Sequence, residues 1–215
     1  MNSDVAVKLA GYLETDELFA RIFAYTRHQF EARPDLTAHN WEHARRDVLN
    51  GIVIGEAEGA DMSIVLPALA MHDIGFLFGA TGTNHGEVGA ARLEDYLNTG
   101  KIELDQAKIE AIRACILTHK GSMFGQKPGS LEAKVVSDAD FIEKFGPIGV
   151  YQAIRTFGEF NFQAEEVIKR LSKRDYELQT PTGESMKQQL IQFSTDFAAA
   201  LAQAYEPYRE AEVTK

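Results

Sequence analysis

Cysteine is almost absent from this chain of 215 residues, which contains only Cys115. A single cysteine cannot form an internal disulfide or a cysteine-rich zinc cluster, so the sequence predicts a reducing compartment and metal ligation, if any, by nitrogen and oxygen. Long apolar runs are also lacking. Uncharged stretches such as residues 62–71 are far shorter than the ~18 apolar residues of a membrane-spanning helix. The first ten residues lack the basic and apolar pattern of a secretory signal, so we expect a cytoplasmic protein.

Positive charge is scarce as well. The chain has 22 Lys and Arg residues against 32 Asp and Glu residues, a formal net charge of −10. Such a surface lacks the broad positive field on which nonspecific duplex binding depends, so we expect no broad nucleic-acid binding. A phosphate-bearing ligand would have to be attracted locally, for example by a bound metal. The composition gives no indication of the oligomeric state.

The remaining composition is that of an ordinary globular protein. Hydrophobic residues make up 45% of the chain and charged residues 25%, which excludes a disordered, collagenous or coiled-coil chain. No repeat, low-complexity tract or long linker interrupts the sequence. The length predicts one compact domain with a sizeable core, because two domains would each be small.

The hydrophobic pattern is overwhelmingly helical, and strands are hardly indicated anywhere. Gly59 and Gly75 suit helix ends, and Pro67 fits best in or near the first turn of its helix. The residues between the predicted helices, notably 33–40, 76–84 and 121–129, are expected to be loops. The predicted helices are 17–30, 41–58, 63–73, 85–97, 105–119, 131–145, 147–159, 163–174 and 184–205.

The histidines carry the most information about function. The chain has six, and all except His28 lie at a predicted helix end or at a junction between a loop and a helix. Functional side chains from separate segments can converge at such places. Taken singly, each histidine is more typical of a hydrogen-bonded core or capping residue than of a ligand. The functional interpretation therefore depends on several histidines having independent reasons to meet.

His39 and His43 are the first such pair. Their separation of four residues matches one helical turn, so both rings can project toward the same side if the helix begins at about Asn40. The pair suits a metal ligand beside a proton donor.

His72 and Asp73 form a different arrangement. Adjacent residues diverge by about 100° on a helix, so they can hold two sides of one ion while the carboxylate bridges to a second. The dipeptide alone is weak evidence, because a histidine near a helix C-terminus also interacts favourably with the helix dipole.

Two further candidates lie on predicted helices downstream. His119 continues a stripe formed by Ile109, Ile112 and Ile116, which places it on the buried face. Asp138 and Asp140 are about 200° apart on a helix, so only one of them should point at any given site. A charged aspartate next to core valines is costly unless a cation pairs with it. For Asp138 we favour a solvated or capping role.

The ordered set formed by these residues resembles the HD superfamily of metal-dependent phosphohydrolases. Residues 72–75, HDIG, resemble the HDIG variant of its histidine–aspartate doublet. Residues 39–43, HNWEH, are similar to the H-N-x-x-H element of cyclic-nucleotide phosphodiesterases. Residues 84–90, NHGEVGA, resemble the H-x-E-x-G-A segment of binuclear members, and residues 138–143, DADFIE, the D-A-D-x-L-[DE] element. The match covers roughly residues 36–145 in the correct order, which is more specific than any one motif.

The resemblance implies an all-α HD-domain helical bundle. Residues 1–215 are expected to form a single HD-type domain, with a motif core at about 36–145 and the C-terminal helices at 147–205 packing on it. The implied cofactor is a divalent metal, as two ions of Mn, Fe, Ni, Zn or Mg. The implied ligands are His43, His72, Asp73 and Asp140 for the first ion, and Asp73 as a bridge with His85 and His119 for the second.

The resemblance also implies a mechanism. Two-metal sites generate a hydroxide that attacks phosphorus, with Asp73 as the bridging residue of the catalytic centre. His39, with the ordinary pKa of ~6.5 for a histidine, is expected to protonate the leaving oxygen. Lys120 and Arg46 are candidates for balancing substrate phosphate charge, although a solvated surface role is equally compatible with their positions. The expected function is hydrolysis of a phosphoester of a nucleotide or another small phosphorylated metabolite.

Some features depart from known subfamilies. Phe76 stands where cyclic-di-GMP phosphodiesterases of the HD-GYP class carry lysine, and residues 119–125 lack the G-Y-P signature. The short interval between Asp73 and His85 leaves little sequence for the purine pocket of the eukaryotic phosphodiesterases. Two other functions stay open: a mixed-valent diiron oxygenase, since the same ligands suit iron, and a catalytically idle HD module that regulates a partner. His39 favours hydrolysis over oxygenation.

Overall fold

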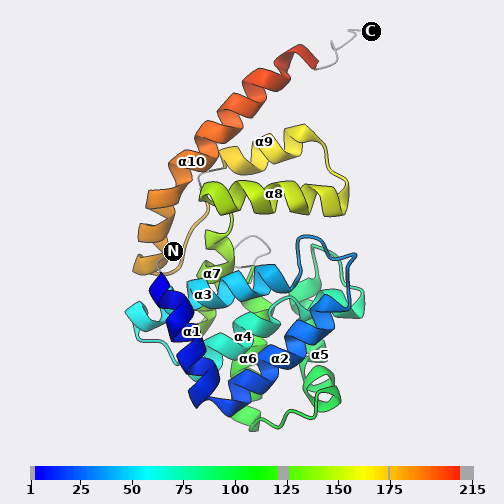
Figure 1. Cartoon of the computed structure of the whole chain (residues 1–215), viewed down its shortest axis with the longest axis vertical. Coiled ribbons are helices and arrows are strands. Elements are labelled where there is room, and N and C mark those ends of the chain that lie inside the picture. The colour runs from blue at the N-terminus through cyan, green and yellow to red at the C-terminus, as the bar shows by residue number, and fades with distance from the viewer. Residues whose placement is uncertain (1–2, 121–125, 174, 209–215) are drawn as a thin grey trace.

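The computed structural model describes residues 3–120, 126–173 and 175–208, and these residues are α-helical without a strand (Figure 1). The all-α prediction is confirmed. None of the described helices is long and apolar enough to cross a membrane. The α-helices are α1 Ser3–Thr15, α2 Glu17–Glu31, α3 Trp41–Glu58, α4 Met62–Met71, α5 His85–Thr99, α6 Gln106–Thr118, α7 Leu131–Ile142, α8 Gly146–Phe160, α9 Ala164–Ser172 and α10 Pro181–Tyr205, with short 3₁₀ helices η1 Ile74–Phe78 and η3 Glu206–Tyr208.

Side-chain caps fix the start of several helices. At the start of α3, α4, α6 and α7, a side-chain oxygen of the residue before the helix accepts a hydrogen bond from a backbone N–H in the first turn. These capping residues are, in the same order, Asn40, Asp61, Asp105 and Ser130. These bonds satisfy donors that have no partner inside the helix. Gly59 ends α3 at φ 73°, a left-handed conformation that glycine adopts without steric cost.

The structure corrects several parts of the predicted helix pattern. Helix α1 was not predicted, since its buried positions among the described side chains are only Val5 and Leu9 and the stripe is short. Pro67 lies inside α4 rather than in its first turn. The predicted loop at 76–84 begins with the 3₁₀ helix η1, and the predicted helix at 131–145 ends at Ile142. Part of the predicted loop at 121–129 lies outside the described residues.

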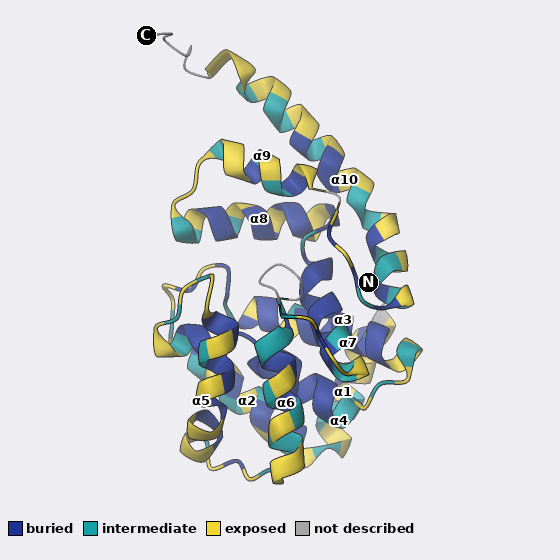
Figure 2. Ribbon diagram, turned by 180° about the vertical axis from the view of Figure 1, so that it is seen from behind, coloured by how far each residue is buried: buried dark blue, intermediate teal, exposed yellow. Residues whose placement is uncertain are grey.

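The main core lies among α1 to α7, with α4 at its centre. Every residue of α4 from Ile64 to Met71 is buried, and α3, α6, α7 and α2 pack around it. Figure 2 shows α7 as buried along most of its length. Because α4 is covered on all sides, the residues that follow it enter the protein interior. His72 and Asp73 are therefore carried into the centre of the molecule.

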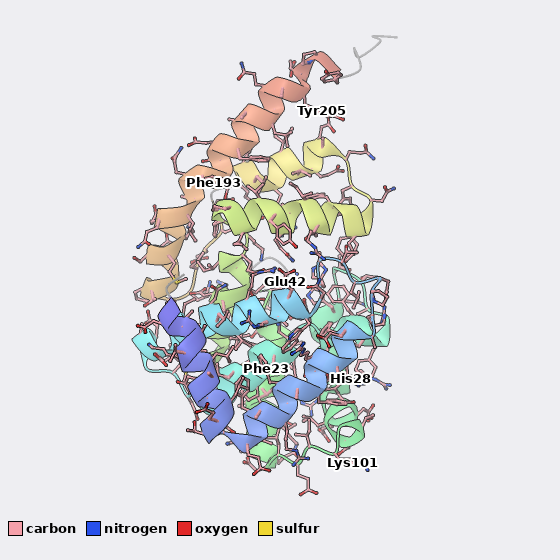
Figure 3. The ribbon with its side chains drawn as sticks, viewed as in Figure 1. Phe23, His28, Glu42, Lys101, Phe193 and Tyr205 are labelled. Carbon is pink, nitrogen blue, oxygen red and sulfur yellow. The ribbon has the colours of Figure 1, made fainter. Side chains whose placement is uncertain are left out.

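The last three helices form a smaller cluster above this core (Figure 1). Helices α8, α9 and α10 enclose a second group of buried apolar residues, while Leu190 of α10 packs against the main core. Phe193 and Tyr205 mark the course of α10 away from the lower helices in Figure 3. Glu42 of α3 faces α8, where it contacts Arg155 at 3.5 Å. A cavity lies between this cluster and the main core. The organisation of the chain as a single domain stays a prediction.

Candidate metal centre

The start of α3 brings His39 and His43 together. The Asn40 side chain caps the helix by accepting a hydrogen bond from the His43 N–H at 3.2 Å. His43 therefore occupies the first turn, while His39 lies just outside the helix. Their ring centroids are 5.9 Å apart, and both side chains are buried. The expectation that the two rings reach one side of the helix is confirmed.

Backbone carbonyls orient the other three histidines. The Nδ1 atoms of His72, His85 and His119 lie 2.7, 3.2 and 2.6 Å from the carbonyl oxygens of Leu69, Thr81 and Ile116. A carbonyl can only accept, so Nδ1 carries the proton in each case and the Nε2 lone pair is left for another partner. This is the usual arrangement of a histidine that ligates a metal through Nε2.

Two groups of ligand atoms result. Within each group the donor atoms all lie within 4.8 Å of one another. The first group draws on α3, α7 and the end of α4, and the second on α5 and the ends of α4 and α6. The groups are His43, Asp47, His72 and Asp140, and Asp73, His85 and His119.

Asp73 links the two groups. Its Oδ2 lies 3.4 Å from Nε2 of both His43 and His72, whereas its Oδ1 lies 3.2 Å from Nε2 of His85 and 3.8 Å from that of His119. One carboxylate thus presents a different oxygen to each group. This is the geometry expected of a residue that bridges two ions.

The two ligand groups contain buried carboxylates whose negative charge would be stabilised by bound cations. Both oxygens of Asp47 and Oδ2 of Asp73 are buried without a hydrogen-bond partner among the described residues, which is costly for a charged group. Burial raises the pKa of the Asp47 carboxyl well above its usual range. Burial would also raise the pKa of Asp73, but the adjacent histidines, led by His72, hold it well below its usual range. The nitrogen and oxygen donors fit divalent ions such as Mn²⁺, Fe²⁺ or Zn²⁺.

Glu143 supports the first group from outside. Its Oε2 accepts a hydrogen bond from Nδ1 of His43 at 2.8 Å, which leaves Nε2 of that ring facing the cluster. Arg46 donates to both oxygens of Glu143 and to Gln152. Burial would lower the pKa of His43, but the carboxylates of Asp47, Asp73 and Glu143 raise it well above its usual range. A metal ion that binds Nε2 of His43 would displace the proton from that atom.

His39 is held by a separate carboxylate. Glu159 of α8 approaches Nδ1 of His39 at 2.6 Å through Oε1, and its Oε2 accepts from the backbone N–H of Ala38 at 2.6 Å. The His39 ring stacks on Phe76 with centroids 4.5 Å apart. Burial lowers the pKa of His39, and Glu159 opposes this effect. His39 is thus fixed beside the ligand groups without belonging to either of them.

A cavity of about 640 Å³ opens onto the cluster. His39, His43, Asp73 and Asp140 reach it from the side of the core. Its wall also contains cationic and aromatic side chains that come from just after α6 and α7, from α8 and α9, and from the segments that follow these two helices. They are Lys120, Lys144, Arg170, Phe160, Phe162 and Tyr176.

Lys144 is the most constrained of these cations. Its Nζ lies 3.2 Å from Oδ2 of Asp140 and 3.8 Å from the centre of the Phe141 ring. Burial lowers the pKa of Lys144 to about 8, with Asp140 opposing the shift. Lys120 lines the same cavity, and its role in balancing substrate charge stays a prediction.

Arg46 requires a correction. It was a candidate for balancing substrate phosphate charge, with a solvated surface role as the alternative, but its guanidinium is engaged by Glu143 and Gln152. It lines a different cavity, of about 970 Å³, between α1, α3, α8 and α10. The helical turn that separates it from His43 places it behind the ligand rather than in front of it. Its role is to hold Glu143.

Asp138 has the capping role that the sequence favoured. Its carboxylate accepts hydrogen bonds from the backbone N–H groups of Gln179 and Thr180 at 2.7 and 2.8 Å, and from the Thr180 hydroxyl at 2.7 Å. It thereby fixes the segment that begins α10. Asp140, two residues later, faces the ligand cluster instead, as the angle of about 200° between the two positions requires.

Known proteins share this arrangement of helices. No family model matches the sequence. YpgQ of Bacillus subtilis, an uncharacterized protein, is 29% identical over 125 residues, which span 57% of this chain and 58% of YpgQ. The chain is thus aligned with somewhat more than half of that relative.

Solved structures extend the comparison to most of the chain. A predicted HD superfamily hydrolase from an uncultured Thermotogales bacterium superposes with a TM-score of 0.59 at 24% identity, covering 86% of this chain and 91% of that one. An HD-superfamily hydrolase from Bacillus thuringiensis gives 0.62 at 18% identity, covering 88% and 97%. The chain has the same helical fold as these two HD-superfamily proteins. The complex of YpgQ with ADP has the same fold, with a TM-score of 0.65 at 18% identity, covering 87% and 95%.

The HD fold brings together every histidine and aspartate that the sequence predicted for the metal site. It also adds residues that sequence reasoning missed, namely Asp47, Glu143, Glu159, Lys144 and Arg170. Asp47 had a usable signal, since it follows His43 by four residues on one helix. Glu143 also had a signal, as the last residue of the DADFIE element, whereas Glu159 had none, because it pairs with a residue 120 positions away.

Proposed function

We propose that this chain is a metal-dependent phosphohydrolase that cleaves a phosphoester of a small phosphorylated metabolite, with a nucleotide as the favoured class. The observation that carries the proposal is the position of Asp73, whose two oxygens face two separate groups of buried ligands beside one cavity. The proposed ligands of the first ion are His43, His72, Asp73 and Asp140, and those of the second are Asp73, His85 and His119.

Two divalent ions held there would supply an activated water molecule and neutralise phosphate charge. The residues of the chain supply the remaining functions. His39 is the proposed proton donor to the leaving oxygen, because its Nδ1 is engaged by Glu159 and its Nε2 is left for a substrate. Glu159 fixes the ring and favours its protonated form, since a carboxylate stabilises an imidazolium.

The wall of the cavity supports a substrate that combines phosphate with a planar ring. Lys120, Lys144 and Arg170 supply positive charge in an otherwise acidic protein. Phe160 and Phe162 supply apolar faces on which a base can stack. The solved complex of YpgQ with ADP is consistent with a nucleotide, because ADP has both groups.

The experiment is a substrate screen with the purified, metal-free protein. The protein is reloaded anaerobically with Mn²⁺, Fe²⁺, Ni²⁺, Zn²⁺ or Mg²⁺ and incubated with nucleoside mono-, di- and triphosphates, cyclic nucleotides and sugar phosphates. We expect metal-dependent release of phosphate, pyrophosphate or nucleotide from at least one class, and loss of that release in Asp73→Ala.

Two outcomes would contradict the proposal. If no ester is hydrolysed with any metal while the iron-loaded protein consumes O₂ in the presence of a candidate substrate, the chain is an oxygenase. If the protein binds nucleotides but turns over none of them with any metal, it is a binding module. In both cases the cavity would have another role.

A further inference from the structure

Asp47 is the one member of the two ligand groups that the sequence pattern did not single out. It follows His43 by one helical turn on α3, so both side chains reach the same side of the helix. Its Oδ2 lies 3.3 Å from Nε2 of His43 and 3.4 Å from Nε2 of His72. These are the two nitrogen atoms that the orientation of the rings leaves available for a metal.

The surroundings of Asp47 give it no other partner. The residue is 0% exposed, and neither carboxylate oxygen accepts a hydrogen bond within the described part of the chain. The other buried carboxylates near the site are satisfied differently, since Asp140 contacts Lys144 and Glu143 contacts Arg46. A purely structural aspartate would be expected to accept hydrogen bonds, as Asp138 does from Gln179 and Thr180.

We propose that Asp47 is a further protein ligand of the first metal ion, beside His43, His72 and Asp140. This inference rests on the proposed metal centre. With Asp47 included, four side chains and Asp73 would hold the first ion, whereas Asp73, His85 and His119 would hold the second. The second ion then has more coordination positions for substrate and water, because ions such as Mn²⁺ and Mg²⁺ prefer six oxygen or nitrogen ligands.

The inference also concerns charge. Asp140 is paired with Lys144, so Asp47 would supply the one negative charge of the first group that no lysine or arginine of the described residues neutralises, and Asp73 would be shared between the two ions. The first ion is therefore expected to be held tightly as part of the protein, while the second keeps positive charge for an anionic substrate. Removal of Asp47 should weaken the first ion and leave the ligands of the second unchanged.

The test is Mn²⁺ binding alone, measured by equilibrium dialysis on the metal-free full-length chain without substrate. We compare wild type with Asp47→Asn, which keeps the shape but removes the charge. Even residues that only hydrogen-bond to the ligands of a metal typically contribute 10–100-fold to the affinity of the site for that metal. We therefore expect one of the two dissociation constants to rise by at least ~10–100-fold in Asp47→Asn, with the other changed only slightly.

Asp138→Asn is the matched control, because it removes the charge of a buried aspartate outside both ligand groups. It should bind Mn²⁺ as wild type does, whatever it does to thermal stability. If Asp47→Asn does not fold, Asp47→Ser replaces it in the same measurement. Unchanged Mn²⁺ affinities in the folded Asp47 variant would overturn the inference, and failure of wild type to bind any divalent metal would overturn the metal centre itself.

Discussion

Glu159→Gln is the most informative change near His39. The Glu159 carboxylate accepts from the Ala38 N–H through one oxygen and holds Nδ1 of His39 at 2.6 Å through the other. A glutamine has only one oxygen, so it cannot accept both bonds. Either the Ala38 N–H loses its acceptor, or the amide NH₂ faces Nδ1 and favours the unprotonated ring.

The size of the effect follows from the bond that is lost. A hydrogen bond to a charged group is worth ~1.5–3 kcal/mol, and one pKa unit corresponds to 1.36 kcal/mol, so the pKa of His39 should fall by ~1–2 units. Burial already lowers the pKa of His39, and Glu159 opposes that shift. A proton donor acts only below its pKa, so the falling limb of the pH–rate profile should move to lower pH by the same amount. At pH values above the new limb, turnover should be lower by ~10–100-fold.

The assay compares two substrates over a range of pH. A phosphoester with a poor leaving group needs the proton, whereas a nitrophenyl ester expels a stable anion and should respond much less. Glu165→Gln is the control, because it removes the same charge from an exposed position on α9. A pH–rate profile of Glu159→Gln that coincides with wild type, or equal losses on both esters, would refute the role given to the pair of Glu159 and His39.

Two further predictions concern the individual histidines. The His39→Ala variant should keep its metal content, because His39 belongs to neither ligand group. Its turnover of the ester with a poor leaving group should be roughly 10²–10⁴-fold lower than that of wild type. Loss of metal in this variant, seen by elemental analysis, would instead make His39 a ligand. The double variant His85→Ala/His119→Ala should lose one ion and keep the other, because His43 and His72 remain. If elemental analysis finds the wild-type metal content in the double variant, the group of Asp73, His85 and His119 is not a metal site.

Much of the fold follows from local patterns that the sequence displays directly. The spacing of Ile109, Ile112, Ile116 and His119 predicted a helix that carries the histidine on its buried face, and the structure has that arrangement. Asn40 and Gly59 predicted the two ends of α3 for reasons that concern only neighbouring residues. Such signals depend on one or two turns of backbone. They were sufficient for the described α-helices except α1, whereas the 3₁₀ helices η1 and η3 were not predicted.

The parts of the site that escaped prediction depend on tertiary contacts. Arg46 was a candidate for balancing substrate charge, but Glu143 holds it behind His43. Glu143 and Glu159 come from α7–α8 and reach α3 and the loop before it, so no periodic pattern in the sequence connects these pairs. The histidines could be predicted because metal ligands require particular residue types. Glu143 is the last residue of the DADFIE element, although the sequence did not show that it pairs with His43. Glu159 could not be predicted, because many glutamates could serve and only packing selects one.

The most direct test of the account is the metal content of wild type and Asp73→Ala after anaerobic loading and removal of free metal, measured by elemental analysis. Asp73 presents one oxygen to each ligand group. The account predicts about two divalent ions per wild-type chain and loss of most of them in Asp73→Ala, since a bridging residue serves both ions. An Asp73→Ala protein that is folded and keeps the full wild-type metal content would contradict it.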